Sequence, residues 1–397
     1  MEKAEVIIIG GGAAGLTSAL AVDKKAIVLE RSERVGRKLS ATGNGQGNVG
    51  NVNAGESRYF TFGERRLISS VFDRYPQGRT LGFFENLGFV FGSDDRGRIY
   101  PSSRQASSVT DLMRFNLAAQ KNKRIITGAT VSDIEKKGKK FVVTAVCDGK
   151  NVLFEADKVI LCAGGKAAKN FGTDGNGYAL AKRLGHTVTD LYPSLVQLKT
   201  DTTHIRSLKG QRVNAVVTAI CDGKITAAET GDVIFTDYGV SGDAIFRISA
   251  FIADKIDRGA VLSLDLMPDA SESELENIII NRTKRAAIPE GETLCGVLSN
   301  VVGRAVIKRA GDVNARSLAS LIKNFTLKVT GTTGFDCAQV TKGGVLLSEV
   351  GEDMQSKITK GLYFAGEILD VDGQCGGYNL QWAFSSALVA AESVNDD

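Results

Sequence analysis

Short continuous runs of apolar residues recur along the chain, and such runs are typical of strands buried on both faces. Val6–Ile9, Ala26–Leu29, Val159–Leu161 and Gly361–Phe364 fit this pattern. Between them, apolar residues return at helical spacing, for example along Val109–Leu117. Buried strands that alternate with amphipathic helices predict an α/β fold built on a parallel sheet.

The middle of the chain changes character. Phe141–Cys147 and Asn151–Phe154 flank an Asp-Gly pair and predict a β-hairpin, and nearly the same eight residues recur at Val217–Lys224. From about Leu191 short strands follow at turn-sized spacing, with Lys224–Ala228 and Asp232–Thr236 expected as separate strands. This region predicts a small β-domain.

Residues 271–325 return to helical periodicity. Ser271 and Glu274 have the spacing of a capping box, which marks a helix start. The apolar stripes along this segment are typical of a core and carry no recognisable chemistry.

The first apolar run leads into a glycine-rich turn. Gly10, Gly12 and Gly15 have the spacing G-x-G-x-x-G directly after the run and before a short helical segment. In this context the first glycine permits the turn, the second lets the backbone approach a pyrophosphate, and the third lets helix and strand pack closely. The free N–H groups at the helix start attract phosphate. We therefore expect an adenine dinucleotide here.

An acidic residue completes this motif. Glu30 lies 20 residues after Gly10, at the end of the second apolar run. A carboxylate at that place can accept the hydroxyl hydrogens of an adenosine ribose and would repel a 2′-phosphate.

A second glycine-rich segment, Ala41–Asn51, is expected to be neither helix interior nor strand interior. Two interpretations stay open: a flexible surface loop, or a backbone-rich loop against a flat or anionic ligand with Arg37 and Lys38 nearby.

The C-terminal segment indicates which dinucleotide binds. A strand ends in Gly366 and Glu367, a glycine-rich stretch follows, and a small-residue helix is expected over Ala383–Glu392. An acid there can hold ribityl hydroxyls, and a helix N-terminus can stabilise a reduced flavin ring. The alternative is a C-terminal helix that only docks on the sheet.

Composition and charge exclude several classes. The formal net charge is +4 and the basic residues are scattered, which disfavours a nucleic-acid partner, a tRNA-modifying role included. The six cysteines show no metal-binding spacing, so no metal site or disulfide framework is expected. The absence of a signal-like start and of a long apolar span leads us to expect a cytoplasmic protein without membrane contact.

Several stretches together resemble one bacterial family of FAD-dependent oxidoreductases. They are GGGAAGL, GRKLSATGNG, DKVILCAGGKA, GYALAKRLGHTVTDLYPSLVQL, FTDYGVSG, QVTKGGV and GLYFAGEILDVDGQCGGYNLQWAFSSA. Members of the family have been described as aminoacetone oxidase-like flavoproteins and as a reductase of bile-acid dehydroxylation. The resemblance covers nearly the whole chain and is weakest over residues 271–325.

The resemblance implies a Rossmann-type, glutathione-reductase-like α/β fold. We expect a discontinuous FAD domain of residues 1–190 and 342–397, an inserted β-rich substrate domain of residues 191–270 and 326–341, and a helical subdomain of residues 271–325.

It also implies which residues hold FAD. The AMP half is expected at Gly10, Gly12, Ala13, Ala14, Gly15, Glu30, Arg31, Val131, Ala163 and Gly164. The pyrophosphate, ribityl chain and ring are expected at Lys38, Gly43, Asn44, Gly45, Gly366, Glu367, Gly377, Asn379, Leu380 and Gln381.

The chain departs from the family at one place. Family members usually have Arg-Cys-Asn-Leu-Thr-Asn after the Gly-Asn-Gly, whereas this chain has Gln46-Gly47-Asn48-Val49-Gly50-Asn51. The missing charge and thiol would lie close to the flavin, so FAD binding should survive while activities that depend on them need not.

The sequence supports two functional hypotheses. One is an FAD-dependent oxidoreductase that transfers hydride between flavin and a small organic substrate, with NADH or NADPH as a candidate transient reductant. Cys375 and Tyr378 are then the catalytic candidates, with the substrate expected near Tyr238 and Ser241. The other is a flavin-binding redox sensor or partner-binding protein with little turnover.

Overall fold

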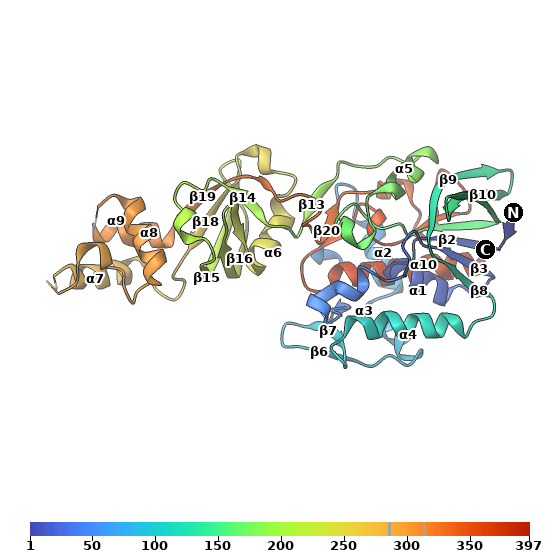
Figure 1. Ribbon diagram of the computed structural model, residues 1–397, viewed down its shortest axis with the longest axis horizontal. Helices are drawn as coiled ribbons and strands as arrows, with labels where there is room; N and C mark the ends of the chain where they lie inside the picture. Colours follow the sequence, from blue (N-terminus) through green and yellow to red (C-terminus); the bar gives the residue numbers. More distant parts are fainter. Residues whose placement is uncertain (285–286, 313) are drawn as a thin grey trace. The chain divides into compact units, whose positions relative to one another are not determined.

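The computed structural model describes residues 1–284, 287–312 and 314–397 (Figure 1). The chain forms two compact units, Met1–Tyr192 with Val340–Asp397, and Pro193–Gln339. The expected helical subdomain falls within the second unit, apart from residues 285–286 and 313, which lie outside the described residues.

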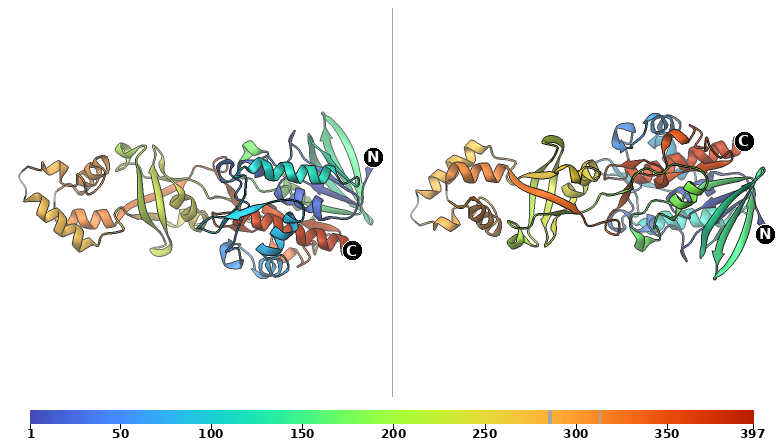
Figure 2. Two further views of the ribbon diagram at one scale, coloured as in Figure 1. Left: turned by 90° about the horizontal axis from the view of Figure 1, so that it is seen from below. Right: turned by 90° about the horizontal axis from the view of Figure 1, so that it is seen from above.

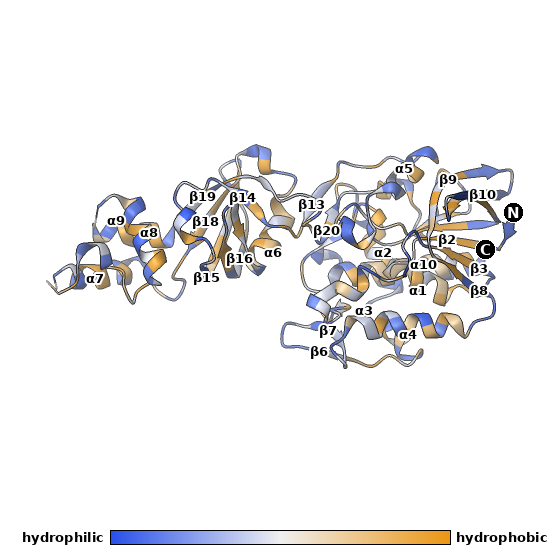
Figure 3. Cartoon of the chain, viewed as in Figure 1, coloured by the Kyte–Doolittle hydropathy of each residue, from blue (hydrophilic) through white to orange (hydrophobic). Residues whose placement is uncertain are grey.

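A five-stranded sheet is the centre of the first unit, and all its neighbouring strands run parallel. Its order is β21 (Leu362–Phe364), β12 (Lys158–Leu161), β2 (Val6–Ile9), β3 (Ala26–Leu29) and β8 (Lys123–Ile126). The inner strands are hydrophobic along their length (Figure 3), as strands covered on both faces must be. The predicted α/β Rossmann-type fold is confirmed.

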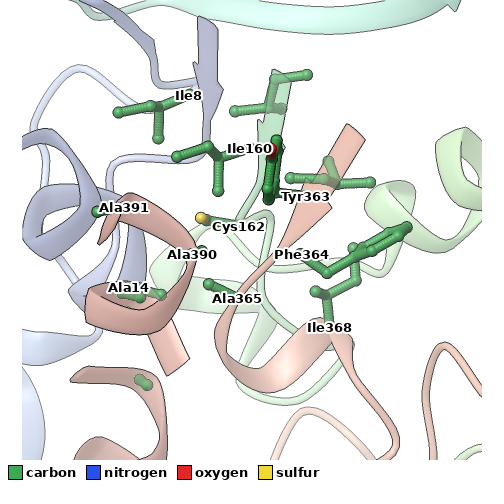
Figure 4. Close-up of a cluster of buried hydrophobic side chains, with 14 of the residues drawn as sticks. Ile8, Ala14, Ile160, Cys162, Tyr363, Phe364, Ala365, Ile368, Ala390 and Ala391 are labelled. Carbon is green, nitrogen blue, oxygen red and sulfur yellow. The ribbon is translucent and has the colours of Figure 1, made fainter. Parts of the chain in front are cut away.

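Two helices pack beside each other against this sheet, α1 (Ala13–Ala21) and α10 (Tyr378–Asp396) (Figure 2). Ala14, Ala390 and Ala391 lie around the buried Cys162, close to Ile8 and Ile160 of the sheet (Figure 4). Small side chains at these positions let the helices approach the strands closely.

The last helix is longer than predicted. It begins at Tyr378, not at Ala383, with Gly377 in a left-handed conformation (φ 97°) as its N-cap. Because α10 is buried on nearly every side, its sequence has no polar face whose periodicity would mark the start. As a result Tyr378 and Gln381 lie in its first turn and not in a loop.

A second sheet of the first unit contains the predicted hairpin. β9 (Ala129–Lys137), β10 (Lys140–Cys147) and β11 (Lys150–Ala156) are antiparallel, and β1 (Glu2–Lys3) joins the edge. Asp148 and Gly149 both have positive φ, as a two-residue hairpin turn requires.

The first unit has further short strands and helices. They are β4 (Gly50–Asn51), β5 (Tyr59–Phe60), β6 (Phe91–Ser93), β7 (Arg98–Pro101), β20 (Val340–Lys342), β22 (Asp372–Gly373), α2 (Arg66–Arg74), α3 (Gln77–Glu85), α4 (Ala106–Ala118) and α5 (Asn176–Arg183), with β13 (Tyr192–Ser194) at the boundary. The expectation that Ala41–Asn51 lacks regular structure is partly wrong. Its first half lies in a 3₁₀ segment (Leu39–Gly45) that is broken at Thr42–Asn44, and its end pairs as β4 with β7.

The second unit is a closed barrel with helices attached. Its strands are β14 (Leu198–Thr200), β17 (Gly239–Ser241), β16 (Lys224–Phe235), β15 (Arg212–Cys221), β18 (Val261–Asp265) and β19 (Phe325–Thr332), and its helices are α6 (Asp243–Ile252), α7 (Glu272–Thr283), α8 (Asn300–Ala310) and α9 (Ala315–Lys323). The capping box of Ser271 and Glu274 is present. The two strands expected over residues 224–236 are one, because β16 keeps its pairing with β15 through Glu229–Gly231.

His186 links the end of α5 to a distant loop of the first unit. Its Nδ1 lies 3.2 Å from Glu349 Oε2 and its Nε2 lies 2.8 Å from Ser356 Oγ. Burial lowers the pKa of His186, and the opposing effect of Glu349 does not restore it. The neutral imidazole is therefore the form that the fold stabilises.

This linkage predicts how stability depends on pH. The pKa of His186 is lower in the folded protein than the unfolded value of about 6.5. The stabilisation from the buried neutral imidazole is therefore complete above about pH 6.5 and is lost as the pH falls toward the folded-state pKa. Thermal unfolding between pH 7.5 and 5 should show a smaller loss of stability on acidification for His186→Gln than for the unaltered protein. His204→Gln, at the chain's other histidine, is the control. Equal pH slopes for His186→Gln and the unaltered protein would contradict this assignment.

Candidate functional site

The turn between β2 and α1 is shaped by its glycines. A Cβ added at Gly15 would lie 1.8 Å from the Gly10 carbonyl oxygen, and one added at Gly10 would lie 2.5 Å from the Cys162 carbonyl oxygen. At Gly12 an added Cβ would meet no atom within 4 Å. Gly10 and Gly15 are thus required by packing, whereas Gly12 borders open space.

The start of α1 faces that space with donors. Gly12 is its N-cap and receives no side-chain cap, and the first intrahelical bond is donated by Leu16. The N–H groups of Ala13, Ala14 and Gly15 therefore have no partner within the helix. Such a helix start binds phosphate.

Glu30 braces the same turn. Its Oε2 accepts from Gly11 N and its Oε1 accepts from Ser32 N, both at 2.7 Å. Each carboxylate oxygen keeps further acceptor capacity. Glu30 can therefore accept the backbone hydrogen bonds that stabilise the turn and, at the same time, hydrogen bonds from ribose hydroxyl groups.

The other residues expected around the AMP half lie next to Glu30. Ala129 N donates to Glu30 O (2.8 Å), which brings the start of β9 and Val131 to this edge of the sheet. Arg31 forms an ion pair with Asp174 (2.6 Å). Although partial burial of Asp174 opposes the effect, the hydrogen bonds from Arg31 and Asn176 N lower the pKa of that carboxyl.

Ala163 and Gly164 follow β12 directly. Cβ atoms added at Gly10 and Gly177 would lie 3.1 Å from Ala163 Cα and 2.6 Å from Ala163 Cβ, respectively. Ala163 is therefore packed between the glycine turn and α5, and Gly164 continues the chain in a left-handed conformation.

The segment after β3 contains a tight left-handed turn. Gly43, Asn44 and Gly45 all have positive φ (58°, 54° and 85°). These three residues and Gln46 are exposed, so the backbone of this turn is open to a ligand.

Two asparagines tie this segment to the other end of the chain. Asn51 Nδ2 donates to Gly376 O (2.9 Å), and the Asn48 amide, oriented to satisfy both its groups, accepts from Gly377 N (3.0 Å) and donates to Gly50 O (2.9 Å). The glycine-rich segment and the start of α10 are thus in direct contact. Asn48 and Asn51 are not among the residues expected at the site from the sequence, although their position among glycines was an available signal.

An ion pair also connects the segment after β3 with the segment after β21. Lys38 Nζ donates to Glu367 Oε2 (2.7 Å), and Glu367 Oε1 accepts from Thr341 N (2.9 Å). Both charged side chains are largely covered, so the pair lies at a protected place between the two ends of the chain.

The first turn of α10 contains three of the predicted ring-contact residues. The side-chain amide of Asn379 forms two hydrogen bonds with the backbone of Gly373: Nδ2 donates to Gly373 O and Oδ1 accepts from Gly373 N (both 2.8 Å). Leu380 is half-buried against the core. Gln381 is fully buried; its Nε2 donates to Ser385 Oγ (3.0 Å), while its Oε1 has no hydrogen-bond partner among the described residues.

Gly366 joins α1 to α10. A Cβ there would lie 2.8 Å from Ala14 Cβ, the Trp382 indole donates to Gly366 O (3.2 Å), and Gly366 N donates to Ser386 Oγ (3.0 Å). The chain's one tryptophan therefore fixes the strand end that leads to Glu367.

Two arginines accompany the catalytic candidates. Arg58 lies 5.9 Å from the centroid of the Tyr378 ring. Burial raises the pKa of Tyr378, and Arg58 only partly opposes this. Arg98 lies beside Gly376; its hydrogen bond to Asp94 is the main factor that raises its pKa, and the half-buried Cys375 adds to it. Because burial raises its pKa, Tyr378 keeps its proton at neutral pH.

The donors present fit FAD. Gly12 borders open space beside uncapped N–H groups, as a pyrophosphate site requires, and Gln381 presents a buried polar atom without a partner at the start of a second helix. Tyr238 and Ser241 belong to the second unit, and their expected role stays a prediction.

Other kinds of site are not found in the described ranges. No cluster of metal-binding side chains occurs among the residues described, and none of the described helices has the length and apolar character needed to cross a membrane. A surface cavity of the first unit, between Glu64–Leu67 and Leu347–Lys357, includes none of the predicted site residues.

Comparison with known proteins identifies the family of the chain. The family model described as HI0933-like protein Rossmann domain matches residues 4–393. The chain is 37% identical to a 3-dehydro-bile acid delta(4,6)-reductase of Clostridium scindens over 98% of both chains. It is 26% identical to a ribosomal RNA dihydrouridine synthase of Haemophilus influenzae over 99% of both chains.

Among solved structures, the fold is similar to that of 3-ketosteroid-delta4-(5alpha)-dehydrogenase from Rhodococcus jostii. The TM-score is 0.55 at 13% identity, covering 100% of this chain and 97% of that one. It is also similar to quinol fumarate reductase FrdA of E. coli, with a TM-score of 0.53 at 16% identity, covering 100% and 71%. From the family model and the bile acid reductase, the chain belongs to the HI0933-like family of FAD-dependent oxidoreductases.

Proposed function

We propose that this enzyme is a reductase that saturates a carbon–carbon double bond conjugated to a carbonyl group. The Clostridium scindens relative is named for reducing double bonds of a 3-dehydro bile acid, and the Haemophilus influenzae relative for making dihydrouridine. These substrates differ, but a ketone conjugated to double bonds and the uracil ring share a C=C bond next to a C=O group. A small organic molecule of that chemistry is the proposed substrate.

The observation that carries the proposal is the contact between the two ends of the chain. Lys38 pairs with Glu367, while Asn48 and Asn51 hold Gly377 and Gly376. In addition, Gly366 packs against Ala14 of α1, next to the glycine turn. These contacts support a single FAD that extends from Gly12 to Gln381.

The proposed cofactor residues follow from this arrangement. The N–H groups of Ala13–Gly15 would bind the pyrophosphate, Glu30 the ribose, and Glu367 the ribityl hydroxyls. The first turn of α10 would lie at the pyrimidine edge of the ring, where its positive end favours the reduced form.

Bound FAD would supply hydride to the β-carbon of the substrate, after taking up two electrons from a donor such as NADH or NADPH. The electron pair of the double bond then moves toward the carbonyl oxygen. Tyr378 gives a proton to the α-carbon and recovers one from solvent, so the product gains two hydrogens. The buried, neutral phenol is the group suited to that transfer.

The experiment uses the FAD-loaded protein without oxygen. Flavin absorption should disappear when NADH or NADPH is added, and it should return when a conjugated cyclic ketone is added but not with its saturated counterpart. If neither nucleotide reduces the flavin, dithionite is used as the reductant. The substrate can then be tested independently of the identity of the electron donor. Failure of the reduced protein to convert any conjugated ketone or pyrimidine would overturn the proposal.

Tyr378→Phe should slow substrate reduction by about 10²- to 10⁴-fold, the usual contribution of a general acid. FAD affinity and flavin reduction by the donor should not change. Tyr75→Phe removes a phenol outside the predicted site and is the matched control. An unchanged turnover of Tyr378→Phe would exclude this residue as the proton donor.

No contact among the described residues favours the redox-sensor alternative, and the named relatives are enzymes.

A further inference from the structure

Along the chain, a buried carboxyl group follows the predicted ribityl contact Glu367 and precedes the predicted ring contacts. Asp370 is 0% exposed. Its Oδ2 accepts from Thr61 Oγ1 (3.0 Å) and Phe62 N (2.9 Å), while its Oδ1 has no hydrogen-bond partner among the described residues. A buried oxygen without a partner is costly unless it carries a proton or meets a ligand.

A buried cation, Lys342, lies at the end of β20. Lys342 is 6% exposed, and its ammonium group is 4.8 Å from the ring centroid of Phe60 and 5.7 Å from that of Phe62. Phe60 ends β5 and Phe62 lies in the bend that follows it, and both rings are within reach of the same ammonium group. Phe62 is 43% exposed, which leaves an aromatic surface beside the cation open to a ligand.

The cluster adjoins the proposed FAD site through the chain itself. Lys342 follows Thr341, whose nitrogen donates to Glu367 Oε1, and Asp370 lies three residues after Glu367. Neither Asp370 nor Lys342 has a role among the cofactor contacts above.

Below about pH 6 the Asp370 carboxyl is mostly protonated and can act as a hydrogen-bond donor. Burial raises the pKa of Asp370 to about 6, against the lowering effects of Phe62 N, Thr61, Gly63 N and Lys342. Tyr178 of α5 also faces this group; its own burial keeps it protonated, and Asp370 contributes to raising its pKa. Asp372, two residues further along the chain, begins β22. A carboxylic acid that takes up a proton in an apolar site can donate to a carbonyl oxygen.

We propose that Lys342 and protonated Asp370 bind the carbonyl oxygen of the substrate, with the substrate ring against Phe62. This inference rests on the proposed function, because the electron pair of the reduced double bond moves to that oxygen. Hydrogen bonds from these two groups to the oxygen would stabilise the charge that develops there.

The test uses 4-chlorophenol, whose phenolate resembles the enolate formed on reduction, and 4-chlorotoluene, which lacks the hydroxyl group. The FAD-loaded protein should bind 4-chlorophenol with a change in the flavin spectrum and should bind 4-chlorotoluene at least tenfold more weakly. Lys342→Met and Asp370→Leu should each weaken phenol binding by roughly 10- to 100-fold and leave toluene binding unchanged. Lys357→Met, at an exposed lysine, is the control.

Conservative variants separate this role from a structural one. Lys342→Arg and Asp370→Asn keep a donor at each position and should retain phenol binding within about fivefold. If Lys342→Met does not bind FAD, the inference is tested by comparing phenol binding by Asp370→Asn with phenol binding by Asp370→Leu. No phenol binding by the unaltered FAD-loaded protein, or equal phenol binding by Asp370→Leu, would overturn the inference. Enone reduction without phenol binding would leave the proposed function standing, whereas phenol binding without enone reduction would refute that function alone.

Discussion

Gly12→Ala is expected to lower the affinity for FAD by about two orders of magnitude and to leave the folding stability of the FAD-free protein nearly unchanged. A Cβ at this position meets no atom of the chain within 4 Å, and φ of −83° suits alanine. The methyl group would instead occupy the space in which the pyrophosphate approaches the backbone. Overpacking of that kind costs about 3 kcal/mol, which corresponds to a factor of about 100 in affinity.

Gly15→Ala provides the contrast. Its Cβ would lie 1.8 Å from the Gly10 carbonyl oxygen, so strand and helix must separate. The free energy of unfolding of the FAD-free protein should fall by about 3 kcal/mol, and FAD binding should fall with it. FAD titrations and denaturant unfolding of both variants check the pair. Equal stability of the two variants, or full FAD affinity in Gly12→Ala, would contradict the assignment of the turn.

Glu30→Gln is expected to weaken FAD binding at least tenfold and to lower the free energy of unfolding by about 2 kcal/mol. The carboxylate accepts from Gly11 N and Ser32 N through different oxygens. A glutamine offers one oxygen and one NH₂ group, so one backbone donor would face another donor. Charge-assisted hydrogen bonds of this kind contribute about 1.5–3 kcal/mol each.

The neighbouring Glu33 is exposed, and Glu33→Gln is therefore the control. Unfolding in urea and FAD titration by fluorescence give both quantities. A Glu30→Gln variant as stable as the control, with unchanged FAD affinity, would show that Glu30 neither braces the turn nor binds the ribose.

Local patterns predicted the central fold. The runs at Val6–Ile9 and Ala26–Leu29 form β2 and β3 because such runs are long enough only for buried strands. The hairpin turn at Asp148-Gly149 is repeated at Asp222-Gly223, where both residues again have positive φ. Short-range chemistry alone is enough for these elements.

Contacts between distant segments could not be predicted in the same way. The hydrogen bonds of Asn48 and Asn51 to Gly377 and Gly376 span more than 320 residues of the chain, and no local pattern encodes them. The start of α10 at Tyr378 was missed because a helix buried on all sides has no amphipathic signal. Asp370 likewise becomes notable only when its burial is known.

The most direct test of the central claim is a crystal structure of the protein grown with FAD. One FAD per chain is expected, with its pyrophosphate at the N–H groups of Ala13–Gly15 and its pyrimidine edge at the first turn of α10. A ring bound away from Gly377–Gln381, or protein that takes up no FAD at all, would contradict the proposal that the two ends of the chain form one cofactor site.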